Sequence, residues 1–511
     1  MYGLEDDTRI KHVLVGIEAR GGLMAETSYA PRTGAIARVV PETPADGVAD
    51  VLGAAQAAAA EVGSVAPAVR RDWLEAIARA LEEHDDELVA LADEETALGE
   101  PRLSGELVRA ASQLRFYGAV AAEGSWLGAT IETEPGLRRV ARPLGPVAVF
   151  GASNFPFGFG VLGNDTASAL AAGCPVIAKA HPAHVGLSVR LAEVATDALT
   201  AAEAPPGTLG LVVGMDAGAA LVRADEIAAV GFTGSQRGGL ALWRIANERE
   251  RVIPVYAEMG TVNPVVMTTS APVGEVAAGF VGSFTMGFGQ YCTKPGLLLA
   301  PAGRGVPGAV AAALSAAAPQ GWSLTAAIAR DYAAGLGELL VNGAEKLVET
   351  PAQTSGWAGS PAVLRVDAAA LKRGSRLLEE CFGPVAVVAE YADAAELEAV
   401  VSELQGALAA SVMSGGDSDP ETAALVARLS EKVGRVAVNE WPTGVAWTWA
   451  QQHGGPWPAT TAPATTSVGA AALERFVRPV TYQRVPDGAL PPALQDANPW
   501  AIPRRVDGVV S

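Results

Sequence analysis

The sequence has few cysteines, little positive charge and no long hydrophobic run. Only Cys174, Cys292 and Cys381 occur in 511 residues, and so odd and sparse a set argues against a disulfide framework and indicates a reducing, cytoplasmic setting. The formal net charge is −19, without a run of five basic residues, which argues against nucleic acid or a membrane surface as the partner. No apolar stretch reaches the roughly 18 to 20 residues that cross a bilayer. We therefore expect a small-molecule partner.

What the chain has instead is a regular alternation of strand and helix patterns. Alanine-rich amphipathic stretches at 49–63 and 70–98 predict a pair of helices. Short β-rich runs then alternate with helical stretches before and after Cys292, which predicts two α/β units with parallel sheets. The runs are 145–153, 174–181, 207–214, 227–234 and 252–260 in the first set, and 294–303, 383–392, 406–416 and 434–441 in the second.

Three segments lie outside this alternation. Residues 1–24 lack the continuous apolar region of a secretory signal, and we treat them as an extension without an assigned role. Residues 125–145 alternate apolar and polar side chains, which predicts a projecting hairpin. The tail from Val480 is polar and proline-rich, so we expect it to lie on a neighbouring surface instead of forming core.

The three cysteines differ in their neighbours. Cys174 lies among apolar residues at a strand start, which is typical of a core position. Cys381 follows two glutamates, whose charge raises the pKa of a thiol and reduces its reactivity. Cys292 lies in the glycine-rich loop "FTMGFGQYCTKPG", where Lys294 favours a thiolate. The residue types alone leave Cys292 open as a nucleophile or as a buried spectator.

Two other stretches indicate a ligand site. Glu258 ends the apolar run "VIPVYAEMG", and α/β sheets bind ligands at the carboxyl ends of their strands, although a solvated strand end has the same pattern. In "GFTGSQRGG", Gly234, Ser235 and Gly239 form a small-residue turn before a helical pattern, and the N–H groups at a helix start favour phosphate. The spacing differs from the dinucleotide fingerprint, so a plain strand-to-helix turn stays open.

Six motifs follow one another along the chain: "FGASNFPFGFG" with Asn154, "VIAKAHPAH" with Lys179, "GFTGSQRGG", "AEMG" with Glu258, "GQYC" with Cys292, and "EECFGP" with Glu380 and Phe382. In this order they resemble the motifs of the aldehyde dehydrogenase superfamily over about residues 30 to 485. The segments "NEWPTGVAW" and "HGGPWPATT" are among those most similar to the branch of 2-oxoglutarate-semialdehyde (2,5-dioxopentanoate) dehydrogenases and NADP-dependent fatty aldehyde dehydrogenases.

The resemblance implies an α/β fold with a Rossmann-like cofactor-binding domain, an α/β catalytic domain and a small β oligomerisation arm. The arm implies a homo-oligomer, either a dimer or a tetramer. The expected bounds are 25–124 and 146–258 for the cofactor-binding domain, 259–470 for the catalytic domain, and 125–145 and 471–511 for the arm and tail.

The resemblance also implies a reaction. The Cys292 thiolate would attack an aldehyde to form a thiohemiacetal, and the side-chain amide of Asn154 and the backbone N–H of Cys292 would hold the oxyanion. Hydride transfer to a nicotinamide would leave a thioester on Cys292. Glu258 would then activate the water that releases the carboxylate.

The cofactor implied is NADP or NAD. Lys179 and Glu380 match the positions that bind the two riboses, and Phe382 lies on the nicotinamide side. Relatives that prefer NAD carry a glutamate three residues after the lysine, where this chain has Pro182. Arg237 would neutralise a 2′-phosphate, and Asp216 in "VVGMDAG" would oppose it. The expectation is therefore NADP, with NAD left open. The pyrophosphate turn comprises Gly234, Ser235 and Gly239.

The expected substrate is 2-oxoglutarate semialdehyde, and its far carboxylate requires a cation. Semialdehyde dehydrogenases of the succinate type place an arginine about nine residues after the catalytic asparagine, but Gly163 stands there. Arg109 and Arg115 are the candidates in its place, although a solvated helix face would explain either arginine, and Phe157 is the candidate apolar contact. A fatty aldehyde or another semialdehyde is the alternative substrate.

A different class of function is a thiol esterase or acyltransferase that uses Cys292 without a redox step. Such an enzyme needs a base beside the thiol, and the five histidines show no obvious pairing with a cysteine in the sequence.

Overall fold

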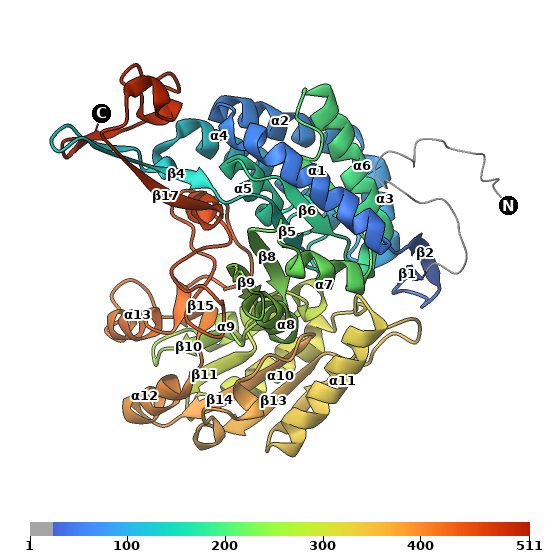
Figure 1. The fold of residues 1–511 in the computed structure, drawn as a ribbon. Coiled ribbons are helices and arrows are strands. Elements are labelled where there is room, and N and C mark those ends of the chain that lie inside the picture. The colour runs from blue at the N-terminus through green and yellow to red at the C-terminus, as the bar shows by residue number, and fades with distance from the viewer. Residues whose placement is uncertain (1–23, 511) are drawn as a thin grey trace.

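The computed structural model describes residues 24–510, so nearly all of the predicted extension at 1–24 lies outside the described residues. Figure 1 shows two α/β units that lie one above the other, with a narrow β arm projecting from the upper one. None of the helices in the described part of the chain is long and apolar enough to span a bilayer.

The upper unit begins with the hairpin β1 (Ala25–Tyr29) and β2 (Ile36–Pro41) and a layer of helices. The stretch predicted as one helix over 70–98 forms two helices that meet at His84. Three acidic side chains fill the first turn after His84, and carboxylates at that position stabilise a helix start. The helices between β2 and the arm are α1 (Ala45–Ser64), α2 (Pro67–Glu83), α3 (Asp85–Thr96) and α4 (Glu100–Glu123), and α1 packs mainly on the other face of the sheet from α2 and α4.

The sheet of the upper unit has five parallel strands in the order β7-β6-β5-β8-β9. Alternate side chains serve two cores: Val147 and Val149 of β5 face the cluster with α2, α4, α5 and α6, and Ala148 and Phe150 face the cluster with α1, α7 and α8. The elements are β5 (Val147–Phe150), α5 (Asn164–Ala172), β6 (Val176–Lys179), α6 (Val185–Ala201), β7 (Leu209–Val212), α7 (Met215–Arg223), β8 (Ala229–Gly234), α8 (Gln236–Asn247) and β9 (Val255–Met259).

The lower unit holds a seven-stranded sheet in the order β12-β13-β14-β11-β10-β15-β16, parallel except for β12. Strands β11, β14 and β15 fall in three of the four runs predicted after Cys292, and β16 begins one residue before the fourth. The elements are β10 (Pro264–Met267), α9 (Val273–Thr285), β11 (Leu297–Pro301), α10 (Val306–Ala317), α11 (Ala326–Val341), β12 (Glu345–Glu349), β13 (Ala362–Asp367), β14 (Val385–Tyr391), α12 (Ala394–Glu403), β15 (Ala407–Met413), α13 (Thr422–Ser430) and β16 (Val433–Val438). The α/β fold class is confirmed.

The arm is a sheet in the order β17-β4-β3-β18-β19. Strands β3 (Thr130–Glu132) and β4 (Leu137–Pro143) pair antiparallel, as the hairpin prediction requires. The expectation for the tail is wrong: β17 (Val477–Gln483) pairs with β4 along its whole length, and tail residues enter a small core with Leu127, Ile131 and Val140. The proposed domain bounds stay a prediction. The remaining strands of the arm are β18 (Arg505–Val506) and β19 (Val509–Val510). The tail residues in its core are Leu490, Ala493, Leu494 and Ile502.

Candidate active site

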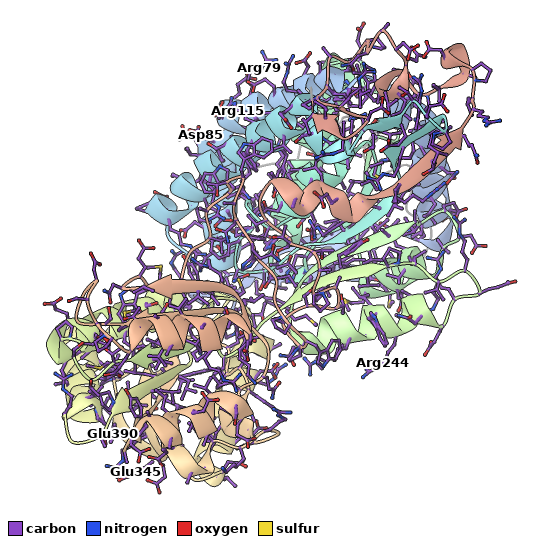
Figure 2. All side chains as sticks on the ribbon, turned by 90° about the vertical axis from the view of Figure 1, so that its left-hand side faces the viewer. Arg79, Asp85, Arg115, Arg244, Glu345 and Glu390 are labelled. Atoms are coloured by element: carbon purple, nitrogen blue, oxygen red, sulfur yellow. The ribbon has the colours of Figure 1, made fainter. Side chains whose placement is uncertain are left out.

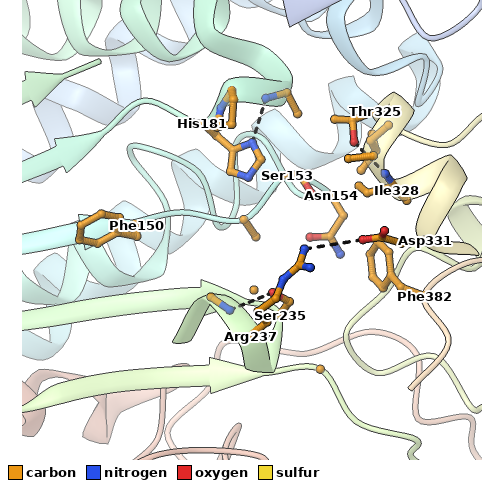
Figure 3. A pocket seen from close by; sticks show the side chains of 18 of the residues that line it. Phe150, Ser153, Asn154, His181, Ser235, Arg237, Thr325, Ile328, Asp331 and Phe382 are labelled. Carbon is orange, nitrogen blue, oxygen red and sulfur yellow. Dashed lines mark hydrogen bonds and ion pairs between the residues drawn. The ribbon is translucent and has the colours of Figure 1, made fainter. Parts of the chain in front are cut away.

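A cavity of about 840 Å³ lies between residues of the two units. Its walls come from the carboxyl ends of β5, β6 and β8, from the start of α8, and from segments of the lower unit around Cys292 and α11. Figure 3 shows Asn154, Ser235, Arg237 and Phe382 around this space. The predicted site residues that line the cavity are Asn154, Lys179, Gly234, Ser235, Arg237, Cys292, Glu380 and Phe382.

Cys292 lies in a tightly turned loop that follows α9. Residues Gly287, Phe288 and Gly289 have φ values of 55°, 60° and 68°, and a Cβ on Gly289 would lie 2.2 Å from the carbonyl oxygen of Gly383. Glycine is therefore required at 289, where the backbones of two segments nearly touch.

Asn263 fixes this loop and was missed by the sequence reasoning. It is fully buried, and its Nδ2 donates to the carbonyl oxygens of Cys292 at 2.7 Å and of Lys294 at 3.2 Å. Its Oδ1 accepts from the backbone N–H of Ala409 at 3.2 Å. The asparagine thus ties the loop at 286–294, which carries the predicted nucleophile Cys292 and is called the nucleophile loop below, to β15. Its place in "GTVNPVV", directly before a strand, carried no signal of this role.

His453 was also missed, and it joins Glu258 and Cys292. Its Nε2 lies 3.8 Å from the Cys292 sulfur and 3.4 Å from Oε2 of Glu258, which stands in β9. The side chains of His453 and Glu258 are 1% and 3% exposed. The His453 backbone is held by Thr466 and Ser467. The phrase "HGGPWPATT" contained the histidine, but only the fold brings it to a cysteine 161 residues away.

The surroundings of Cys292 favour the neutral thiol. Burial is the largest cause that raises the pKa of Cys292 well above its ordinary value, followed by the negative charges of Glu258 and Glu380. The backbone N–H of Thr293 and the guanidinium of Arg109 act in the opposite direction. A group that accepts the thiol proton is therefore needed before the sulfur can attack a carbonyl.

The expectation that Lys294 favours the thiolate is wrong. Its ammonium is buried and donates to the carbonyl oxygens of Cys381 at 2.6 Å, Gly383 at 3.2 Å and Val385 at 2.9 Å. A buried ammonium requires such partners. Lys294 instead fastens the nucleophile loop to the segment before β14 that carries Glu380.

Asn154 faces the nucleophile loop. Its Nδ2 donates to the carbonyl oxygen of Gln290 at 2.7 Å, two residues before Cys292. The backbone carbonyl oxygen of Asn154 accepts from Nη2 of Arg102 at 2.6 Å, and the Arg102 guanidinium carbon lies 4.9 Å from the ring centroid of Tyr291. An amide donor therefore stands on the cavity side of the cysteine, held from behind by an arginine of α4.

The start of α8 offers backbone donors to the cavity. Ser235 precedes the helix, and its hydroxyl accepts from the N–H of Gly238 at 3.2 Å. Gly239 does not line the cavity, because it packs against β9: a Cβ there would lie 2.8 Å from the Met259 sulfur and 3.1 Å from Cβ of Ala257. Gly239 thus permits close helix-strand contact, and Gly238 takes the place predicted for it.

Two titratable groups lie at opposite parts of the cavity wall. Burial lowers the pKa of Lys179, and the carboxylates of Glu26 and Glu42 act against this. Burial raises the pKa of Glu380 to about 7, against the positive charge of Lys294. Both groups can hydrogen-bond hydroxyls of a sugar, as the resemblance implies for ribose.

Arg237 spans the cavity mouth. Its guanidinium lies 3.7 Å from Oδ2 of Asp331 in α11, and its side chain is 88% exposed. Figure 3 shows this pair reaching from the start of α8 towards the opposite wall. An exposed pair of this kind contributes about 0 to 1 kcal/mol, so Arg237 is free to change partner when an anion enters.

The two candidate arginines of α4 have different environments. The Arg109 guanidinium carbon is 4.8 Å from the Trp447 ring centroid and 5.7 Å from that of Phe159, and its charge acts to lower the pKa of Cys292, although Arg109 is not among the residues that line the cavity. Its Nε donates to Gln113 at 3.3 Å, and its buried Nη2 has no hydrogen-bond partner among the described residues. Arg115 lies on the outer helical layer, as Figure 2 shows, and pairs there with Glu75 and Glu82. The structure therefore contradicts a substrate role for Arg115.

The candidate contacts near Asn154 also differ. Phe157 is 1% exposed and belongs to the helical core instead of the cavity wall, so the prediction of a substrate contact there is wrong. A Cβ on Gly163 would lie 2.5 Å from Cα of Phe159. The backbone at 163 thus leaves no room for the arginine that succinate-type relatives carry.

Comparisons with known proteins agree with this geometry. The profile described as "Aldehyde dehydrogenase family" matches residues 22–461. The chain is 44% identical to alpha-ketoglutaric semialdehyde dehydrogenase 2 of Azospirillum brasilense, over 86% of this chain and 87% of the relative. It is 39% identical to alpha-ketoglutaric semialdehyde dehydrogenase of Acinetobacter baylyi, with the same coverage.

A solved structure has the same fold. The 1-pyrroline-5-carboxylate dehydrogenase from Thermus with bound NAD superposes with a TM-score of 0.78 at 22% identity, over 90% of each chain. The resemblance of the six motifs is confirmed. The chain belongs to the aldehyde dehydrogenase family, whose NAD(P)-dependent members oxidise aldehydes to carboxylates.

Proposed function

We propose that this enzyme oxidises 2-oxoglutarate semialdehyde to 2-oxoglutarate. The observation that carries the proposal is the shared name of the two relatives at 44% and 39% identity, both described as alpha-ketoglutaric semialdehyde dehydrogenases. The buried Nη2 of Arg109 supports it, because this nitrogen has no acceptor among the described residues and a substrate with a distal carboxylate supplies one. A fatty aldehyde would leave Nη2 without an acceptor.

We infer the following roles for the first half of the reaction. His453 takes the thiol proton of Cys292, since its Nε2 faces the sulfur. The sulfur attacks the aldehyde carbon, and a thiohemiacetal forms. The Asn154 amide, together with the backbone N–H of Cys292, stabilises the oxyanion, a kind of donor whose loss typically costs about 100- to 1,000-fold in rate.

Bound NAD(P) supplies a hydride acceptor, and Lys179, Ser235, Glu380 and Phe382 are the residues that would hold it. Loss of hydride from the thiohemiacetal carbon leaves a thioester on Cys292. Neither carboxylate oxygen of Glu258 accepts a hydrogen bond from residues 24–510, so the carboxylate is available to accept a proton from water. The water then attacks the thioester, which releases the carboxylate and regenerates the thiol.

Arg109 provides the test of the substrate. The change Arg109→Met is expected to raise KM for 2-oxoglutarate semialdehyde by about 10- to 150-fold, because a charge-assisted hydrogen bond contributes roughly 1.5 to 3 kcal/mol. Oxidation of hexanal should change less than about threefold, since that substrate has no carboxylate. Steady-state kinetics with 2-oxoglutarate semialdehyde, succinate semialdehyde and hexanal measures both effects.

The matched control is Arg115→Met, which removes an arginine of the same helix that is paired with Glu75 and Glu82. It should leave all three KM values unchanged. If wild-type enzyme prefers hexanal to 2-oxoglutarate semialdehyde, the proposed substrate is wrong. If the semialdehyde is preferred but Arg109→Met has no selective effect, another group binds its carboxylate.

We also infer a preference for NADP. Pro182 lines the cavity where a glutamate would oppose a 2′-phosphate, and Arg237 is exposed at its mouth.

Pro182→Glu is expected to raise KM for NADP by about 10-fold or more relative to NAD, because two like charges about 4 Å apart cost on the order of 1 to 4 kcal/mol. Arg244→Ala, a change of an exposed arginine in the same helix as Arg237 (Figure 2), should leave the ratio unchanged. A lower KM for NAD than for NADP in the wild type would contradict the preference.

Three further proposals complete this function. The three cysteines are free thiols, which supports a cytoplasmic, reducing location. The projecting arm sheet supports a homodimer or homotetramer, since Val509 and Val510 are exposed there. The thiol esterase alternative gains the histidine that it needs, but the family match and the cofactor-sized cavity favour the dehydrogenase.

A further inference from the structure

We propose that Glu258, Cys292 and His453 together bind a thiophilic divalent cation of the Zn²⁺ class. The three side chains come from β9, from the loop after α9, and from the loop before the tail. Their potential ligand atoms, one carboxylate oxygen, one sulfur and one ring nitrogen, all lie within 4.8 Å of one another. They are the one such group that residues 24–510 bring together.

Two of the three separations are close to those of a tetrahedral zinc site, and the third, between the Cys292 sulfur and a Glu258 oxygen, is within 4.8 Å. Bonds of about 2.3 Å to sulfur and about 2.0 to 2.2 Å to nitrogen and oxygen place neighbouring ligands roughly 3.3 to 3.7 Å apart. Here Nε2 of His453 lies 3.8 Å from the Cys292 sulfur and 3.4 Å from Oε2 of Glu258.

An unpartnered buried group is aimed into this site. The Glu258 side chain is 3% exposed, and neither of its oxygens accepts a hydrogen bond from the described residues. A buried carboxylate without a donor is costly, and a cation removes that cost. The thiol proton leaves to solvent as the sulfur-metal bond forms, so the thiolate and the carboxylate together balance the double charge without any redox step.

The backbone around the three ligands is already ordered. Asn263 holds the carbonyl oxygen of Cys292 at 2.7 Å, and the N–H of His453 donates to Thr466 at 2.8 Å. Cys292 also lines the large cavity, so an ion has a route of entry and a free coordination position for water. The site thus needs little reorganisation to bind metal.

Metal binding has a consequence that rests on the proposed role of Cys292. A sulfur that is bonded to a cation cannot attack an aldehyde. Zn²⁺ should therefore inhibit reversibly, and a chelator should restore the activity.

The test uses Co²⁺ as a spectroscopic probe. Chelator-treated full-length enzyme, without cofactor or aldehyde, is titrated with CoCl₂, and the thiolate-to-cobalt charge-transfer absorption is recorded. The expected result is an absorption that saturates at about one ion per chain and disappears when Zn²⁺ is added. Glu258→Gln and His453→Gln should each weaken Co²⁺ binding by at least about tenfold.

Two controls make the result specific. Cys292→Ser, or alkylation of Cys292 in folded wild-type enzyme, should remove the absorption, whereas Cys381→Ser and His84→Gln should retain it. The proposal is overturned if wild-type enzyme shows no such absorption, or if both Glu258→Gln and His453→Gln bind Co²⁺ as tightly as the wild type. Because the titration contains no aldehyde, failure of the proposed substrate would leave this outcome unaffected.

Discussion

Replacing Cys292 by serine is expected to lower kcat for aldehyde oxidation by about 10⁴-fold or more. A serine hydroxyl has a far higher pKa than a thiol, and it is a much weaker nucleophile towards a carbonyl carbon. Loss of a nucleophile that works together with a base and an oxyanion donor removes nearly all of their shared effect. The measurement is the rate at which reduced cofactor appears under saturating substrate.

The cofactor should still bind to this variant, because Lys179, Ser235 and Glu380 remain in place. Cys174→Ser is the control, since Cys174 is buried and its sulfur lies 3.3 Å from the carbonyl oxygen of Phe476, a contact that a hydroxyl can keep. That variant should retain near wild-type kcat. A Cys292→Ser enzyme within tenfold of the wild-type rate would remove Cys292 from the mechanism.

The second large effect is expected for Glu258→Gln. The amide has nearly the same volume as the carboxylate but cannot accept a proton, so general-base assistance worth about 100- to 10,000-fold is lost. The loss should fall on hydrolysis of the thioester and not on hydride transfer. Stopped-flow mixing should therefore show a burst of about one reduced cofactor per chain, followed by a slow steady state.

A deuterated aldehyde separates the two steps. The burst of Glu258→Gln should slow with deuterium, whereas its steady state should not, because hydride transfer no longer limits turnover. Glu250→Gln, at an exposed position beyond α8, is the matched control and should behave as wild type. If Glu258→Gln has no burst and its steady state keeps the isotope effect, Glu258 acts before the thioester forms.

Parts of the fold followed from local patterns. Strands β5, β6, β7, β8 and β9 lie inside the five predicted runs, because buried parallel strands read as short apolar segments between helices. The break at His84 was not predicted, because the amphipathic spacing of apolar residues continues across it. Only the structure shows that one helix ends and the next begins there. The prediction for the tail was wrong for a related reason. Leu490, Leu494 and Ile502 are scattered along the sequence and form a core only after β17 pairs with β4.

The two candidate arginines of α4 show what a sequence pattern cannot predict. Arg109 and Arg115 are six residues apart, and at about 100° per residue they point to different faces of the helix. The sequence therefore indicates that the two arginines have different surroundings, but not which of the two faces lies on the side of Cys292. Packing decided it, because Arg109 meets Phe159 and Trp447 from later in the chain, and Arg115 meets Glu75 and Glu82 of the neighbouring helix.

The sequence by itself determined the family and the α/β class, and it predicted Cys292, Glu258 and Asn154 as the catalytic residues, because the order of short motifs along the chain carries that information. Only the tertiary structure decided that His453 stands between Cys292 and Glu258, that Lys294 turns away to three carbonyl oxygens, and that burial and two carboxylates raise the pKa of the Cys292 thiol. Those facts depend on distances and burial between residues far apart in the chain, and no local pattern encodes them.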